Sequence, residues 1–315
     1  MSTPTTPASA SPGISRRNVS KALVLIVIGS LGIQLSSAAS AGMFDALGSG
    51  AVSALRMLIA AAVLCVLFRP RIRGRSRASW VGILVYGVAM AAMNFSLYAA
   101  IDRLPLGVAV TLDFLGPCAV ALLGSRHLKE GLCAVLALAG VVLIAGPSGY
   151  FDLAGYLFGL AAAFFFALYT VFAERVGKDE GGLSGLALSV VVAAVVSLPV
   201  GVPRFPEVTA PQWGMLTVSA LLGVVLAYAV DTIAARISSA RVVGTLFSMD
   251  PVIGSLVGTL LMGQIISLTG WIGILTVTVA GALLVWISGH PAKHPTTADL
   301  DADTNPVPVP VGETA

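Results

Sequence analysis

The sequence predicts an all-α polytopic membrane protein with ten transmembrane helices, arranged as two five-helix inverted repeats. Three observations lead to this fold class. The chain of 315 residues is 57% hydrophobic and only 10% charged, whereas soluble domains carry about 25% charged residues. Apolar runs long enough to cross a bilayer recur along the whole chain. The outline of the stretch around Pro117 also returns around Pro251.

The apolar runs divide into ten segments of about 17–25 residues, the length that an α-helix needs to cross a bilayer. The fifth is short and ends at Gly146-Pro147. The tails at residues 1–15 and 291–315 are rich in Pro, Thr, Ser and Asp, which predicts disorder. The expected spans are 21–42, 46–68, 80–101, 105–124, 131–147, 153–173, 183–202, 212–235, 242–262 and 268–288.

The first segment, SRRNVSKALVLIVIGSLGIQLSSAASAG, has the twin arginines, apolar core and small residues of a signal sequence. More spans follow it, however, and its polar residues Gln34, Ser36 and Ser37 suit a helix inside a bundle. We therefore interpret it as an uncleaved first transmembrane helix.

The positions of lysine and arginine predict the orientation of the chain. With a cytoplasmic N-terminus, fifteen of the 18 fall in cytoplasmic segments, Arg103 and Arg204 fall outside, and Arg56 lies within a span. An excess of positive charge on the cytoplasmic side is the rule for membrane proteins. We expect both termini in the cytoplasm and the protein in the bacterial plasma (inner) membrane. The run RPRIRGRSR, residues 69–77, is interpreted as a topology determinant, although it could also bind nucleic acid or anionic lipid.

The repeated stretches are VAVTLDFLGPCAV, residues 108–120, and VVGTLFSMDPVIG, residues 242–254. Aligning their prolines pairs the fourth span with the ninth, so the repeat unit holds five helices. A unit with an odd number of helices enters the membrane from the opposite side the second time, which predicts inverted repeats at residues 16–147 and 148–290. Such repeats are typical of secondary transporters, whose substrate site lies near the midplane between them.

Four ionisable residues fall inside the predicted spans, namely Arg56, Asp113, Asp231 and Asp250. A charge at the bilayer centre costs about 2.5–3.5 kcal/mol on insertion scales, so such residues usually face a cavity or a partner. We expect Arg56 either to bind a substrate carboxylate through its two-donor fork or to neutralise one of the aspartates. Asp113 is the preferred proton carrier and Asp250 the second choice, and either could receive an ammonium group. Asp231, near the end of its span, is given a structural or gating role.

Pro117 and Pro251 lack the N–H that would bond the carbonyls of residues 113 and 247. Each is predicted to form a hinge beside a central site, the alternative being a kink used only for packing. Three further residues, Asn94, Tyr98 and Tyr228, are candidates for substrate binding. The first two lie one helical turn apart and share a face. Interhelical hydrogen bonding is the alternative role for all three.

Neither a metal nor a cofactor is predicted. The three cysteines, Cys65, Cys118 and Cys133, stand within apolar runs, and no CxxC or Cys/His cluster occurs in the sequence. We expect the partners to be a small substrate, protons and the lipid bilayer, with no nucleic acid, and the oligomeric state is left open.

Three stretches carry a family resemblance: SALRMLIAAAVLCVLFRP, YGVAMAAMNFSLYAAIDRLPLGVAVTLDFLGPCAVALL and AYAVDTIAARISSARVVGTLFSMDPVIGSLVG. Over roughly residues 20–288 the chain resembles the threonine/homoserine exporters, in the EamA branch of the drug/metabolite transporter superfamily. The resemblance implies a ten-helix bundle with an inverted repeat, and export of small neutral amino acids driven by the proton gradient. Asp113, Asp231 and Asp250 stand where the family leads us to expect glutamates, and Gln264 replaces a glutamate common in wider EamA proteins.

The sequence therefore predicts a secondary active exporter of small neutral amino acids that exchanges them for protons, and not an enzyme. One alternative is export of another cargo of the same superfamily. A more distant alternative is an intramembrane aspartyl protease, because paired aspartates in the membrane could activate water. No GxGD element occurs in the sequence to support the protease.

Overall fold

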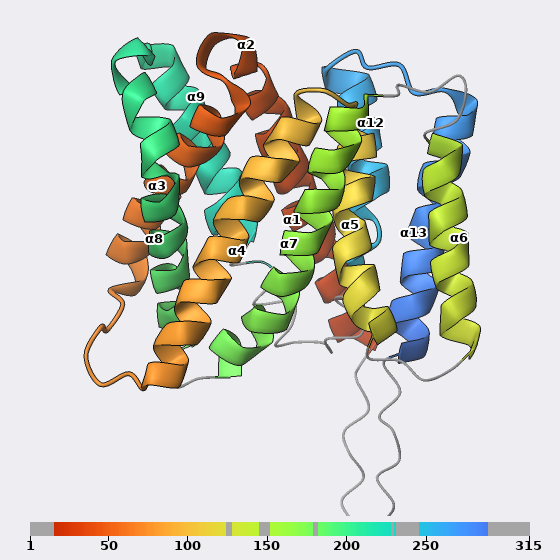
Figure 1. The fold of residues 1–315 in the computed structure, drawn as a ribbon, viewed down its shortest axis with the longest axis horizontal. Coiled ribbons are helices and arrows are strands. Elements are labelled where there is room, and N and C mark those ends of the chain that lie inside the picture. Colours follow the sequence, from red (N-terminus) through yellow and green to blue (C-terminus); the bar gives the residue numbers. More distant parts are fainter. Residues whose placement is uncertain are drawn as a thin grey trace, which may run out of the picture.

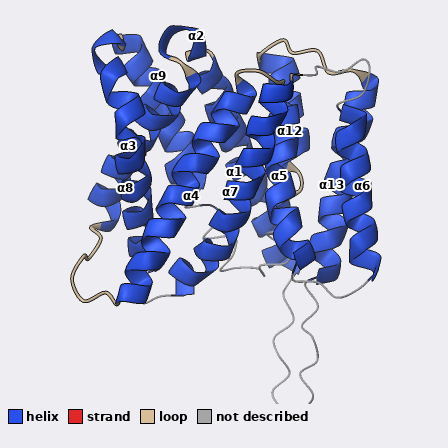
Figure 2. Cartoon of the chain, viewed as in Figure 1, coloured by secondary structure: helices blue, strands red, loops and turns tan. Residues whose placement is uncertain are grey.

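The computed structural model describes residues 16–123, 128–144, 152–178, 182–227, 230 and 246–288, and within them it contains helices and loops but no strands (Figure 2). Both predicted tails lie outside the described residues, as do two of the candidate site residues, Tyr228 and Asp231. The helices are α1 (Arg16–Ala41), α2 (Phe44–Leu47), α3 (Ser49–Phe68), α4 (Arg77–Ile101), α5 (Leu106–Leu123), α6 (Leu128–Ile144), α7 (Leu153–Lys178), α8 (Gly182–Gly201), η1 (Val202–Glu207), α9 (Ala210–Ala220), η2 (Leu221–Leu226), α12 (Asp250–Leu261) and α13 (Leu268–Ser288).

Six of these helical segments are long and apolar enough to cross a membrane: Ser20–Ala41, Ser49–Phe68, Arg77–Ile101, Leu153–Phe172, Ser184–Glu207 and Leu268–Ile287. Four shorter apolar helices accompany them, at Leu106–Val120, Gly131–Ile144, Ala210–Leu226 and Asp250–Leu261. Most of the described helices fall within a few residues of the predicted spans, because polar residues and turn formers bound each apolar run.

The helices run side by side, with α1 near the middle of the bundle (Figure 1). It packs against α9, η2 and α12, and it also contacts α3 and α4. On one side of the bundle α4 packs against α7 and α8, and α3 packs against α8. On the other side α5 contacts α7, α12 and α13, while α6 and α13 form a pair at the edge. The buried polar side chains of α1 therefore lie between the two sides, namely Ser30, Gln34, Ser36, Ser37 and Ser40.

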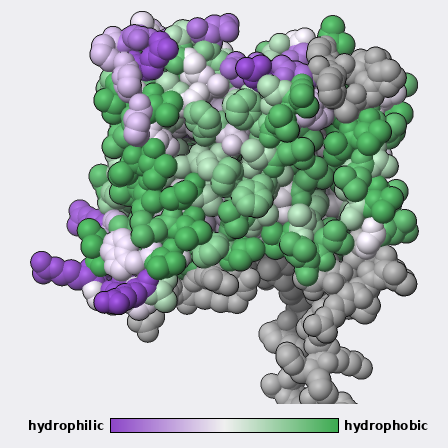
Figure 3. All heavy atoms as spheres, viewed as in Figure 1, coloured by the Kyte–Doolittle hydropathy of each residue, from purple (hydrophilic) through white to green (hydrophobic). Residues whose placement is uncertain are grey.

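The outer surface of the bundle is apolar. Large aliphatic side chains point outward along several helices, such as Val66 (73% exposed), Leu138 (62%) and Leu260 (77%). Figure 3 shows the hydrophobic residues in a broad band, with hydrophilic residues gathered at its two ends. A band of this kind suits the hydrocarbon core of a bilayer, where aliphatic surface needs no cover.

Small residues let neighbouring helices approach closely. A Cβ built on Gly140 of α6 would lie 2.7 Å from the carbonyl oxygen of Gly273 in α13. A Cβ on Gly107 of α5 would lie 2.5 Å from the Cα of Ser255 in α12. Small residues at such crossings are typical of membrane helix pairs, which gain van der Waals contact by close approach. The α5–α12 contact also brings together the helices that carry Asp113 and Asp250.

The two repeated prolines differ in their surroundings. Pro117 lies inside α5, which remains helical through it. Pro251 instead stands in the first turn of α12, just after a turn at Ser248 and Met249. Proline is well suited to a first helical turn, where its missing N–H has no partner to lose. The predicted continuous span 242–262 is therefore wrong in this part, because the helix is interrupted before Asp250 and starts anew there.

A second irregularity was not predicted. After α9, the chain continues as a π-helical segment, η2, over Leu221–Leu226. Such segments are rare and often occur at functional sites. This segment packs against α1 and faces Ser36 of α1 and Arg56 of α3.

Candidate functional site

A buried arginine forms the centre of the first polar cluster. Arg56 of α3 is only 4% exposed. Its Nη1 donates to Ser36 Oγ of α1 at 3.0 Å, and its Nη2 donates to Asn94 Oδ1 of α4 at 2.6 Å. The guanidinium carbon lies 4.6 Å from the centre of the Tyr98 ring, within the range of a cation–π contact. The predicted face of Asn94 and Tyr98 is thus turned toward Arg56.

Serine hydroxyls continue this cluster across α1 and α9. Ser219 Oγ lies 2.8 Å from Ser36 Oγ and 2.7 Å from Ser40 Oγ. Tyr98 donates its phenol hydrogen to Ser40 Oγ at 3.1 Å. All four residues are buried, so the hydrogen bonds bind α1, α4 and α9 together around the guanidinium.

Within the described part of the chain, the hydrogen-bond partners of Arg56 are all neutral. No ion pair joins it to Asp113 or Asp250, although the structure describes all three residues. Its Nε has no hydrogen-bond partner. Burying an unpaired ion costs several kcal/mol even after the protein relaxes. No direct contact supports the predicted neutralisation of one of the aspartates by Arg56, and it stays a prediction beside the binding of a substrate carboxylate.

The π-helical segment brings backbone up to this guanidinium. A Cβ built on Gly223 would collide with Ser36 Oγ and would lie 2.9 Å from Arg56 Nη1. A residue other than glycine would therefore displace the arginine or the serine. The sequence gives no sign of this contact, because LLGVVL looks like any apolar helical stretch.

A second cluster forms where α1, α5 and α12 meet. A Cβ on Gly254 of α12 would lie 3.2 Å from Gln34 Oε1 of α1 and 3.4 Å from Val110 Cγ2 of α5. One helical turn further along each helix come Ser30, Asp250 and Asp113. Residues three or four apart share a helix face, so these three side chains are brought to the same junction.

The contacts of the two aspartates confirm this arrangement. Ser30 Oγ donates a short hydrogen bond to Asp250 Oδ1. Asp113 is 7% exposed and lies one helical turn beyond Val110, which contacts α12 at Gly254. Its Oδ1 has no hydrogen-bond partner, nor does Oε1 of the buried Gln34. The junction therefore offers two buried acceptor oxygens without donors, beside a second carboxylate.

The backbone around the aspartates is also unusual. Because Pro117 has no N–H, it leaves the carbonyl of Asp113 without its helical donor. Asp250 begins α12, where a negative charge interacts favourably with the helix dipole. At the other end of α5, Gln264 Oε1 accepts from the Leu106 N–H at 2.9 Å. Gln264 therefore fixes the start of the helix that carries Asp113.

Sequence reasoning missed three members of the two clusters: Ser30, Ser40 and Ser219. Spacing on α1 was the available signal, since Ser30 lies four residues before Gln34, and Ser36 four before Ser40.

The described residues contain no group of three or more His, Cys, Asp or Glu side chains that could hold a metal ion.

Comparison with known proteins gives consistent results. Residues 153–287 match the EamA-like transporter family. The chain is 30% identical over 267 residues to the threonine/homoserine exporter of Salmonella typhimurium (strain LT2), covering 82% of this chain and 89% of that protein. It is 29% identical over 249 residues to the exporter of the same name from Escherichia coli (strain K12), covering 77% and 83%. A crystal structure of another protein, 19% identical, superposes with a TM-score of 0.57 over 86% of this chain and 99% of that chain, which shows a shared fold.

Proposed function

Since the chain belongs to the EamA-like transporter family, we propose that it exports small neutral amino acids such as threonine or homoserine in exchange for protons. Its relatives are transporters and its apolar helices are numerous, so the protein is a multi-pass protein of the bacterial inner membrane. Membership of a transporter family also removes the intramembrane aspartyl protease from consideration.

The observation that carries the proposal is the buried Arg56, which has no counter-ion among the residues that the structure describes. A carboxylate is the part that all α-amino acids share, and a guanidinium can bind it with two parallel hydrogen bonds. The two present partners, Ser36 and Asn94, are neutral and hold the guanidinium in place. An incoming carboxylate would therefore supply the missing charge and also a partner for the free Nε.

The carboxylate pair supports the coupling part of the proposal. Two carboxylates at one junction repel each other when both are ionised, so a proton bound by either of them relieves the repulsion. Asp113 has a free Oδ1, whereas Asp250 already accepts from Ser30. We assign proton exchange first to Asp113, with Asp250 as the alternative carrier. The outside-facing and inside-facing states would then differ in which side supplies that proton.

We propose further that the chain crosses the membrane ten times as two inverted repeats, residues 16–147 and 148–290, with both termini in the cytoplasm. The six long and four short apolar helices provide for this number of crossings. A reporter that is active only in the periplasm, fused after Gly289, tests the orientation. Reporter activity would contradict a cytoplasmic C-terminus.

The function itself is tested by overexpression in cells challenged with toxic concentrations of homoserine or threonine. The expected result is increased tolerance together with more of that amino acid in the medium. The Arg56→Met variant, which keeps an unbranched chain out to the position of Nε and loses the charged guanidinium, should lose both effects while still reaching the membrane. If the unaltered protein gives neither tolerance nor efflux, the cargo is another metabolite of the superfamily.

A further inference from the structure

Five arginines stand at alternate positions in residues 69–77, which we call the arginine loop. Four of them are exposed and Arg75 is half-buried. Within the part of the chain that the structure describes, no ion pair involves any of the five. A concentrated positive charge therefore lies at the end of the bundle, next to the apolar band (Figure 3).

Hydrogen bonds join the arginine loop to the first turn of α8. Arg75 donates from Nη2 to Ser184 Oγ at 2.9 Å and from Nε to the carbonyl of Arg71 at 3.0 Å. The N–H of Arg71 also donates to Ser184 Oγ, at 3.1 Å. These bonds hold the loop folded back, so the other arginines are presented from an ordered backbone.

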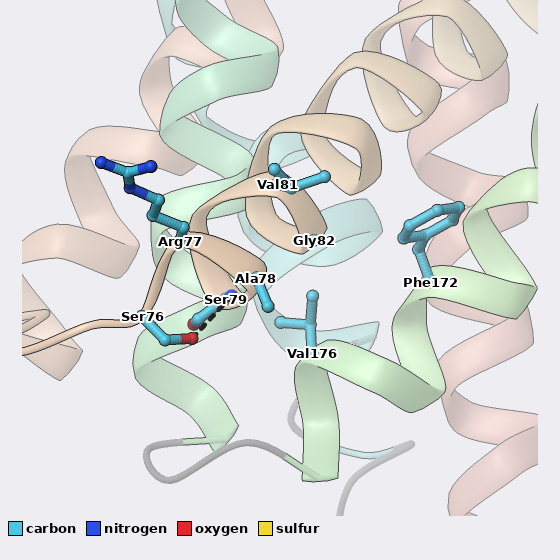
Figure 4. Close-up of a pocket in the computed structure, with 8 residues that line it drawn as sticks. All are labelled: Ser76, Arg77, Ala78, Ser79, Val81, Gly82, Phe172 and Val176. Carbon is cyan, nitrogen blue, oxygen red and sulfur yellow. Dashed lines mark hydrogen bonds between the residues drawn. The ribbon is translucent and has the colours of Figure 1, made fainter.

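A groove of about 490 Å³ opens beside this loop, between the first turns of α4 and the end of α7 (Figure 4). One rim is polar and is formed by Ser76, Arg77 and Ser79. The opposite wall comes from α7, where Phe172 and Val176 face α4. A Cβ on Gly82 would lie 3.6 Å from Val176 Cγ2, so a long side chain at this position would enter the groove.

An apolar track leads away from the groove along α4. Val81, Leu84 and Val88 are 57%, 47% and 45% exposed, and their spacing places them on one face of the helix. Because α4 begins at Arg77, the polar rim lies where the apolar span ends. That is the depth of lipid headgroups, while the track lies at the depth of acyl chains.

We propose that the groove and the arginine loop bind an anionic phospholipid, with its phosphate at the polar rim and one acyl chain along the α4 track. Arginine is well suited to bind phosphate oxygens with two parallel hydrogen bonds. Clusters of basic residues at the end of a membrane span attract anionic lipids. The site is separate from the buried clusters around Arg56 and Asp113, and it does not depend on which substrate is exported.

The test is native mass spectrometry of the purified full-length protein with phosphatidylglycerol or phosphatidylcholine of equal chain length. We expect the unaltered protein to bind phosphatidylglycerol preferentially. The Arg73→Gln/Arg77→Gln variant should bind it about 25-fold more weakly, since each basic residue contributes about fivefold. The control Arg103→Gln/Arg204→Gln removes the same charge from the opposite end and should change nothing.

A second pair of variants separates the groove from diffuse surface charge. Gly82→Leu keeps every arginine but fills the groove, and it should reduce phosphatidylglycerol binding at least fivefold. If Gly82→Leu does not yield a monodisperse protein, Val81→Asp is used instead. It places a negative charge that repels the phosphate at the start of the α4 track, and the same loss of binding is expected. Full lipid binding in either folded variant, or displacement of the lipid by an equal concentration of inorganic phosphate, would overturn the proposal.

Discussion

Replacing Arg56 by lysine keeps the positive charge but removes the two-donor fork. In the structure the fork holds Ser36 at 3.0 Å and Asn94 at 2.6 Å, and its Nε remains free. A lysine ammonium cannot keep these neutral partners and also present two parallel donors to a carboxylate. A hydrogen bond to a charged group contributes about 1.5–3 kcal/mol, so the apparent affinity for the amino acid should fall about 10- to 100-fold.

The assay is uptake of a labelled amino acid into inside-out vesicles, with initial rates measured over a range of substrate concentrations. The unfolding temperature of each purified variant is measured in parallel. Arg204→Lys is the matched control, because Arg204 makes an exposed pair with Glu207 at 2.7 Å and such pairs contribute little. An Arg56→Lys protein that folds and transports with unchanged apparent affinity would show that the guanidinium does not bind the substrate carboxylate in this way.

Three further predictions concern other parts of the chain. Asp113→Asn should lose efflux driven by an imposed proton gradient but retain substrate exchange in loaded vesicles, and a full response to the gradient would exclude Asp113 as the coupling site. Gly223→Ala should abolish transport because its Cβ would push against Arg56, whereas Gly214→Ala, with open space around it, should transport normally and stabilise by about 0.4–1 kcal/mol. A backbone N–H at the start of α7 holds the pKa of Asp152 below its ordinary value of 3.8. The contribution of Asp152 to stability is therefore present above pH 3.8 and is lost as the pH falls through the lowered pKa. Asp152→Asn should lower the unfolding temperature at neutral pH, and its difference from the unaltered protein should shrink as the pH falls below 3.8.

The sequence was sufficient to locate most of the described helices and the centre of the first cluster. Apolar runs end at charged or turn-forming residues, so the expected span 80–101 became Arg77–Ile101 and 46–68 became Ser49–Phe68. Arg56 could be selected because an arginine inside a span must have a reason to be there. Asn94 could be selected as a polar residue inside a span that shares a helix face with Tyr98.

Hydroxyl groups could not be sorted in the same way. Serine and threonine in a helix can bond the carbonyl four residues earlier, as Thr111 does with Gly107 and Ser189 does with Gly185. Ser219 instead bonds across to α1. The residue type is the same in both cases, so the choice depends on which helix packs alongside, and that is a tertiary property.

The two prolines illustrate the same limit. Pro117 and Pro251 occupy equivalent places in the repeat, yet only the second lies at the start of a helix. Gly116 packs directly on the backbone of Ala163 in α7, which holds α5 in place through its proline. Met249, just before α12, is 37% exposed. The contact with α7 thus accounts for the continuity of α5 through Pro117, and the repeated sequence pattern alone does not reveal it.

The tight contact of Gly107 in α5 with Ser255 in α12 is a point about which one helix can tilt against the other. Asp113 lies six residues from this contact on α5, and Asp250 lies five residues from it on α12. The two carboxylates therefore lie about 9 Å and 7.5 Å from the contact, measured along the helix axes. A tilt of one helix by about 10° at this contact would shift the carboxylates relative to each other by roughly 1.5 Å. That shift is larger than the change in donor–acceptor distance that breaks a hydrogen bond. Because α12 begins at Asp250, the helix ends at this carboxylate, and α12 can tilt without unwinding a helical turn.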